Sequence, residues 1–202
     1  MTIVMDEMTH NEILQNQHMV GLPIPKDLVR VGIADTLGNA ISAGFWFLIA
    51  TFLTPEQYGQ LSYFIGIAGF LSYVSLIGTQ NVLTIYSAKN LQFQATFYLF
   101  SFFASIACSI AIIVLFNRID GVFLLLAYVV NTLAIGDLFG KKLYSTYSKY
   151  ILIQKTLGFG LGVGFYFLFG VNGILYALAL SYAMFGFRVY LGIKDSKIDL
   201  SL

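Results

Sequence analysis

Charged residues are scarce in this sequence. Only 10% of its 202 residues are Asp, Glu, Lys or Arg, whereas a soluble domain has about 25%. Hydrophobic residues make up 58% of the chain, and this composition excludes an ordinary soluble domain. It predicts an all-α membrane protein. The net charge of +1 provides no field that would recruit nucleic acid, so we expect no nucleic-acid partner.

Residues that carry metal or catalytic chemistry are also few. The single cysteine, Cys108, cannot form an intrachain disulfide, and we interpret it as a small core residue. His10 and His18 lie in a polar N-terminal segment that supplies no obvious further ligands. No acidic pair in a loop, no His-rich motif and no phosphate-binding glycine loop is visible. The sequence therefore predicts no metal, no cofactor and no enzymatic activity.

Long apolar runs are the main feature that is present. Residues 31–80 contain two of them on either side of the hexapeptide TPEQYG, residues 54–59. About 20 helical residues cross the hydrocarbon core of a bilayer. Pro55 and Gly59 are typical of a helix stop and a tight reversal. We therefore predict a transmembrane hairpin with a hinge at residues 54–59.

The rest of the chain repeats this pattern and predicts a six-transmembrane-helix bundle. Residues 1–30 are interpreted as a cytosolic leader and residues 193–202 as a cytosolic tail. Segments 81–92 and 141–150 are predicted as amphipathic links. In the second, Tyr144, Tyr147 and Ile151 share a helical face, which suggests either an interfacial anchor or a contact for lipid phosphates. The predicted helices are about 31–53, 60–80, 93–116, 121–139, 151–169 and 173–192.

The distribution of basic residues predicts the orientation. With the N-terminus in the cytosol, the outside turns hold only Arg118, and the other ten of the eleven Lys and Arg are inside or near the inner ends of helices. The positive-inside rule therefore favours an N-in, C-in, multi-pass protein of the cell membrane. The inside residues are Lys26, Arg30, Lys89, Lys141, Lys142, Lys149, Lys155, Arg188, Lys194 and Lys197.

Polar residues within the predicted spans are candidates for a binding site. Asp35, Asn39, Ser42 and Trp46 fall on one face of the first helix at 100° per residue. This face lines a cavity or forms a polar seam that joins helices. Asn131 in the fourth helix is interpreted as a partner in a helix–helix hydrogen bond.

The predicted fifth helix is rich in glycine. Gly158, Gly160, Gly162 and Gly164 form two small-xxx-small pairs. Such pairs allow close backbone approach. The alternative is that the glycines soften the helix and let it bend in a transport cycle.

Four charged residues are predicted at one level near the cytosolic side. They are Asp35, Lys155, Arg188 and the end-of-helix residue Asp137. One interpretation is that each side chain snorkels separately to the headgroups. The other is that Asp35 pairs with Lys155 or Arg188 at the mouth of a cavity, where the bases attract a substrate pyrophosphate.

The hinge sequence also resembles a known family. A first helix with a small and polar face, followed by L-x-P-E-x-Y-G and a Gly-rich helix, is similar to the start of the polysaccharide transporters. These are the O-antigen flippase-like branch of the multidrug/oligosaccharidyl-lipid/polysaccharide exporter superfamily. The matching residues are Leu53, Pro55, Glu56, Tyr58, Gly59, Gly78 and Asn81.

The resemblance implies a function and partners. Members move lipid-linked oligosaccharides across the membrane for polysaccharide biosynthesis, with two six-helix lobes around a cavity. Six helices correspond to the N-terminal half, so we expect an incomplete or half-length form that needs a second half or a homodimer partner. Membrane lipid and a lipid-linked saccharide are the other expected partners. The alternatives are an accessory membrane subunit without transport activity and half of a multidrug exporter.

Overall fold

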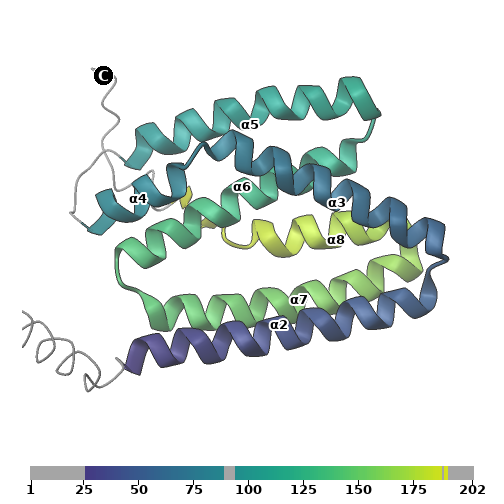
Figure 1. Cartoon of the computed structure of the whole chain (residues 1–202), viewed down its shortest axis with the longest axis horizontal. Coiled ribbons are helices and arrows are strands. Elements are labelled where there is room, and N and C mark those ends of the chain that lie inside the picture. The colour runs from purple at the N-terminus through teal and green to yellow at the C-terminus, as the bar shows by residue number, and fades with distance from the viewer. Residues whose placement is uncertain (1–25, 89–93, 188, 191–202) are drawn as a thin grey trace, which may run out of the picture.

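The computed structural model describes residues 26–88, 94–187 and 189–190 (Figure 1). Within these ranges the chain is helical and contains no strand. Arg188, Lys89, His10, His18, most of the predicted leader and the predicted tail lie outside the described residues. The helices are α2 (Lys26–Phe52), α3 (Pro55–Leu76), α4 (Thr79–Ala88), α5 (Gln94–Phe116), α6 (Ile119–Gly140), α7 (Tyr144–Phe169) and α8 (Val171–Ala183).

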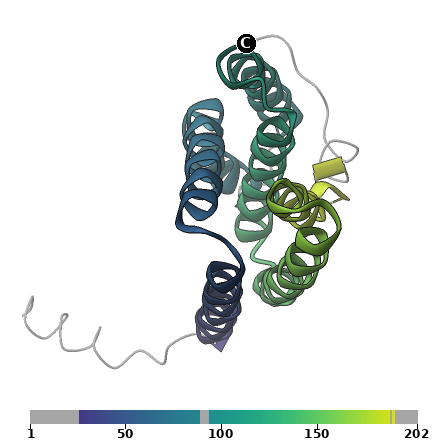
Figure 2. The ribbon, with the colours of Figure 1, turned by 90° about the vertical axis from the view of Figure 1, so that its right-hand side faces the viewer.

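The helices form two groups that meet along α6, α7 and α8. Helices α2 and α7 lie side by side and run parallel, and they form the lower group in Figure 1. Helices α3, α4 and α5 pack with α6 in the upper group. Helix α8 packs against both α6 and α7. Seen along the helix axes, α2 (purple) is well separated from most of α3 (blue), although a short turn joins them (Figure 2).

Five of these helices are long and apolar enough to cross a membrane: α2, α3, α5, α6 and α7. Helix α8 is apolar but shorter, with 13 residues. Helix α6 is the most buried of the five long helices. It contributes Leu124, Leu125 and Leu133 to a core that also includes Leu61 of α3 and Ile174 of α8. Helix α6 is therefore the central helix of the bundle.

The turn between α2 and α3 is shorter than predicted. Helix α2 ends at Phe52 and α3 begins at Pro55. The side-chain oxygen of Thr54 accepts a hydrogen bond from the Gln57 backbone N–H, and the Gln57 side chain accepts one from the Thr54 N–H. This capping box, with proline at the first helical position, starts α3 at once. Gly59 lies inside the helix, so its predicted role in the reversal is wrong.

The predicted second helix is broken near its end. Ile77 and Gly78 have positive φ angles of 42° and 77°, which end α3 in a left-handed cap. Helix α4 follows and packs on α6, where Gly136 and Gly140 allow close contact. A Cβ atom at Gly140 would lie 2.7 Å from the Thr84 carbonyl oxygen. The segment predicted as an amphipathic link is therefore largely a helix that buries one face in the protein.

The segment 141–150 also differs from its prediction as a link. Only residues 141–143 connect α6 to α7, and α7 begins at Tyr144. Tyr147 and Ile151 do share a face, but this face is buried against α2 and α6 rather than lying in the headgroup layer. The apolar face predicted as a membrane anchor is used instead for helix packing.

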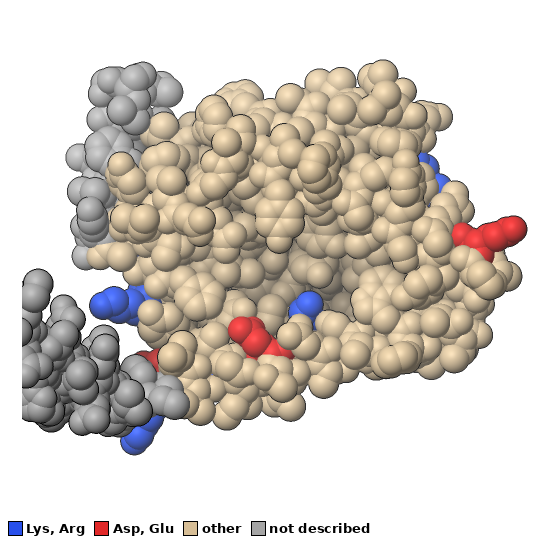
Figure 3. Space-filling model, viewed as in Figure 1, with Lys and Arg blue, Asp and Glu red and all other residues tan. Residues whose placement is uncertain are grey.

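Charged residues lie mainly at the two ends of the bundle (Figure 3). One end holds the start of α2, the end of α6 and the start of α7 (Figure 1), and we call it the basic end. Its basic residues are Lys26, Arg30, Lys141, Lys142 and Lys149. At the opposite end, Arg118 forms an ion pair with Asp120 and donates to the Asn172 Oδ1 atom at 2.8 Å. Together with the five long apolar helices, this arrangement defines a multi-pass membrane protein.

Candidate functional site

The candidate site is a cavity between the two helix groups, which we call the central cavity. It has two adjoining lobes of about 210 and 420 Å³. The first lies between α2, α7 and α8, and the second between α3, α6 and α7. Both lobes are lined by Ile65, Tyr128, Gln154, Lys155 and Tyr182.

The cavity opens on the side of the bundle. Helix α2 packs along α7 and makes no comparable contact with α3. The space-filling view shows a hollow between the upper and lower groups, with one basic and one acidic side chain near its lower edge (Figure 3). The surface around it is almost free of charge. A bilayer or a partner protein would therefore meet this opening.

Among the described residues, Lys155 is the only lysine or arginine that lines either lobe. Its aliphatic stem crosses Gly38 of α2, where an added Cβ atom would lie 3.3 Å from the Lys155 Cγ atom. Gly38 thus leaves room for the stem between the two parallel helices. A charge at the centre of a bilayer costs about 2.5–3.5 kcal/mol on insertion scales, and such residues usually face a cavity or a partner.

An ion pair between Asp35 and Lys155, which one interpretation of the charged layer predicted, is absent. Ion pairs within 4.0 Å among the described side chains join Asp27 to Arg30, Asp120 to Arg118 and Asp137 to Lys141. Asp35 instead accepts a hydrogen bond of 2.7 Å from the Tyr147 hydroxyl. Asp35 does not line the cavity. The sequence did not predict Tyr147 as a donor, because its segment was predicted to lie outside the bundle.

Asp137 also has local partners. It pairs with the Lys141 Nζ atom at 2.9 Å, four residues later on the chain. Its Oδ1 atom lies 3.4 Å from the Ser87 hydroxyl of α4. Among the described residues, the two acids of the predicted charged layer therefore have separate partners. Arg188, the second base of that layer, lies outside the described residues.

The predicted polar face of the first helix divides into two parts. Asn39, Ser42 and Trp46 line the first lobe, whereas Asp35 contacts Tyr147 one turn closer to the basic end. The two interpretations of this face thus apply to different residues. Asn39, Ser42 and Trp46 line a cavity, whereas Asp35 joins α2 to α7. The hinge residues Pro55, Glu56, Tyr58 and Gly59 line neither lobe.

A buried amide pair forms part of the second lobe. Asn131 of α6 accepts a hydrogen bond of 3.1 Å from the Gln154 Nε2 atom of α7. Asn131 therefore joins two helices, as the sequence indicated. Gln154 is only 1% exposed, and its Oε1 atom has no hydrogen-bond partner within the described residues. A buried acceptor without a donor is costly, so a ligand or a water molecule that donates to it would be stabilised here.

The sequence did not predict several of the cavity residues. Gln154 is a polar residue next to Lys155 inside an apolar run, and this signal was available. The two tyrosines Tyr128 and Tyr182 have ring centroids 4.8 Å apart. Their helices are distant in sequence, so no local pattern indicated that they meet.

The four glycines of α7 have two different environments. Gly158 faces Ser181 of α8 and Gly162 faces the ring of Phe45 in α2, both at close approach. Gly160 and Gly164 have no neighbouring atom within 4 Å of a built Cβ. One of the two predicted small-xxx-small pairs, Gly158/Gly162, therefore packs, and the other faces outwards. Helix α7 is continuous across all four.

Besides apolar surface, the described lining of the cavity offers neutral hydrogen-bonding groups and one cation. Amides and hydroxyls can donate and accept, and the faces of aromatic rings bind apolar surfaces and cations. A lysine ammonium binds phosphate oxygens as a compact charge. The polar lining residues besides Lys155 are Asn39, Ser42, Ser72, Tyr73, Tyr128, Asn131, Thr132, Gln154, Ser181 and Tyr182.

These observations define the class of the molecule as an all-helical, multi-pass membrane protein with a cavity that is lined by polar and apolar groups and opens sideways. No family model matches the chain, and comparisons with curated proteins and with solved structures find no significant match.

Proposed function

We propose that this protein is a membrane transporter-class protein that moves a lipid-linked oligosaccharide across the membrane, like the polysaccharide flippases that its hinge sequence resembles. The observation that carries the proposal is the central cavity, in which Lys155 is the single cation among the described residues. Neutral amides, hydroxyls and aromatic rings suit a saccharide, and one ammonium group suits the phosphate that links the saccharide to its lipid. The lateral opening would let the lipid chain remain in the bilayer.

The proposed orientation places the basic end in the cytosol. Of the seven described Lys and Arg residues, five lie at that end, Arg118 lies at the other, and Lys155 lies in the cavity. The positive-inside rule then gives a cytosolic start of α2 in the cell membrane. In this proposal α8 belongs to a sixth span, and both termini are cytosolic.

A partner is proposed to cover the open side of the cavity. Polar groups that face hydrocarbon without hydrogen bonds are costly. Asn39 is exposed on this side of α2, and the first lobe continues behind it. A second six-helix half or a second copy of the chain would cover these groups and complete the translocation path.

The proposal can be tested by transport in proteoliposomes. The purified chain is reconstituted with a lipid-linked oligosaccharide, and appearance of the saccharide on the far side is measured with an added, impermeant glycosidase. We expect transport by the wild type and a loss of at least tenfold in Lys155→Gln. Glutamine retains much of the stem that crosses Gly38, so folding should survive. Lys142→Gln, an exposed lysine at the basic end, is the matched control.

Two outcomes would contradict the proposal. One is transport by Lys155→Gln at the wild-type rate. The other is a folded wild-type chain that moves no lipid-linked saccharide, alone or with its co-purified partner. The second result would favour an accessory subunit without transport activity. Movement of apolar drugs in place of the saccharide would favour half of a multidrug exporter.

A further inference from the structure

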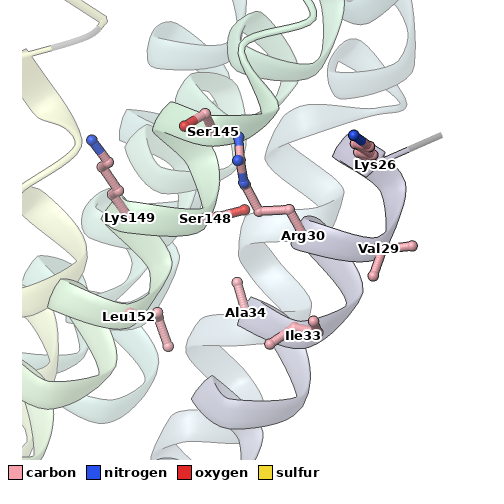
Figure 4. Close-up of a pocket in the computed structure, with 9 residues that line it drawn as sticks. All are labelled: Lys26, Val29, Arg30, Ile33, Ala34, Ser145, Ser148, Lys149 and Leu152. Carbon is pink, nitrogen blue, oxygen red and sulfur yellow. The ribbon is translucent and has the colours of Figure 1, made fainter.

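A second pocket lies at the basic end, away from the residues that line the central cavity (Figure 4). It has a volume of about 610 Å³ and lies between the first turns of α2 and α7. Its lining comes from residues 26–34 of α2 and residues 145–152 of α7. The two helices are parallel, so both begin at this pocket. We call it the basic-end pocket.

Three cations surround the basic-end pocket: Lys26, Arg30 and Lys149. Arg30 extends from α2 across the gap towards Ser145 of α7, and the two lysines lie on either side (Figure 4). Lys26, Arg30 and Lys149 are all exposed, which keeps them accessible to a ligand. The three charges belong to helices that are more than a hundred residues apart in the chain, and only the tertiary fold brings them together.

The described acidic residues do not neutralise this cluster. Asp27 lies 3.8 Å from Arg30, but both side chains are more than half exposed, so this pair is weak. Asp35, one turn deeper, accepts its hydrogen bond from Tyr147. Among the described residues, no carboxylate lines the pocket. Within the described part of the chain, three positive charges and one exposed carboxylate, Asp27, make this a positive site that attracts an anion.

The deeper wall of the pocket is apolar. Ile33 of α2 and Leu152 of α7 lie below the cations, together with Ala34 (Figure 4). Cations above an apolar groove match the order of layers in a bilayer, where headgroup phosphates lie above acyl chains. A soluble phosphate shares the charge of a headgroup phosphate but makes no use of this wall.

We propose that the basic-end pocket binds the phosphate of an anionic phospholipid headgroup. The Arg30 guanidinium donates to two phosphate oxygens, and Lys26 and Lys149 supply further charge. One acyl chain lies along Ile33 and Leu152 between α2 and α7. The Ser148 hydroxyl already donates to the Tyr144 carbonyl oxygen at 3.0 Å, so it is not a donor to the phosphate. The site does not depend on the transport function proposed above.

The test compares lipid selectivity in vesicles. The full chain is reconstituted in phosphatidylcholine, and binding of spin-labelled phosphatidylglycerol is measured against spin-labelled phosphatidylcholine by electron paramagnetic resonance. Each basic residue near a membrane surface contributes about a five-fold preference for anionic lipid. We expect Lys149→Gln to reduce the selectivity by about this factor. The triple variant Lys26→Gln/Arg30→Gln/Lys149→Gln should remove it. Lys142→Gln, at the same end but outside the pocket, is the matched control.

Three results would overturn the proposal. The first is a triple variant, helical by circular dichroism, that retains the wild-type selectivity. The second is an equal loss in Lys142→Gln and Lys149→Gln, which would indicate a diffuse surface potential rather than a pocket. The third is displacement of the labelled phosphatidylglycerol by inorganic phosphate, which would assign the pocket to a soluble anion. Selectivity that persists in phosphate and is lost only in the pocket variants supports the lipid site.

Discussion

The contact between α2 and α7 can be tested by adding one methyl group at Gly162. A Cβ atom at this position would lie 2.5 Å from the Phe45 Cε2 atom and 2.7 Å from its Cζ atom. Phe45 is only 3% exposed, and its ring packs edge-on against Trp46 and Phe159 at centroid distances of 5.0 and 5.9 Å. The ring therefore cannot move aside without disturbing the wall of the central cavity.

The magnitude follows from a comparison within the same helix. Overpacking by one methyl group in a packed core costs about 1–3 kcal/mol. Gly→Ala also gains about 1 kcal/mol of helix propensity in water. Gly160→Ala and Gly164→Ala gain the same helix propensity in the same membrane helix. A Cβ atom at either position meets no atom within 4 Å, so these two variants are controls without the clash. We expect Gly162→Ala to be less stable than either control by about 1–3 kcal/mol.

The assay is reversible unfolding in mixed micelles of mild detergent and dodecyl sulfate, followed by circular dichroism. A double-mutant cycle with Phe45→Leu isolates the clash, because the smaller side chain should tolerate the methyl group and the two effects should not add. Equal stabilities of Gly162→Ala and the two controls would show that α2 and α7 do not meet at this point. Additive effects with Phe45→Leu would lead to the same conclusion.

Two further predictions concern the basic end and the orientation. Tyr147→Phe should destabilise the protein by about 1.5 kcal/mol, because Asp35 loses its donor. The same unfolding assay should show a smaller effect of Tyr147→Phe in an Asp35→Asn background, and equal effects would refute the contact. In a Cys108→Ala background, an impermeant thiol reagent applied to intact cells should label Glu56→Cys and not Lys142→Cys. The reverse labelling would invert the proposed orientation.

The sequence by itself predicted the membrane class, the all-helical fold and approximate positions for the long helices. These features depend on local properties, because apolar length and low charge are set residue by residue. The capping box formed by Thr54 and Gln57 is also a local sequence feature. It indicates a helix that begins directly after Thr54, and therefore a hinge shorter than residues 54–59. The break at Ile77 and Gly78 was less visible, because Gly78 also fits the interior of a packed helix.

Which polar groups meet was decided only by the tertiary structure. Asp35 and Lys155 were predicted at one depth, but depth along a helix does not determine rotation about its axis. The packing of α2 on α7 turned Asp35 to Tyr147 and left Lys155 in the cavity. The same packing placed Lys26 and Arg30 beside Lys149. Contacts between parallel helices over a hundred residues apart depend on how their surfaces fit, and no local sequence pattern encodes that fit.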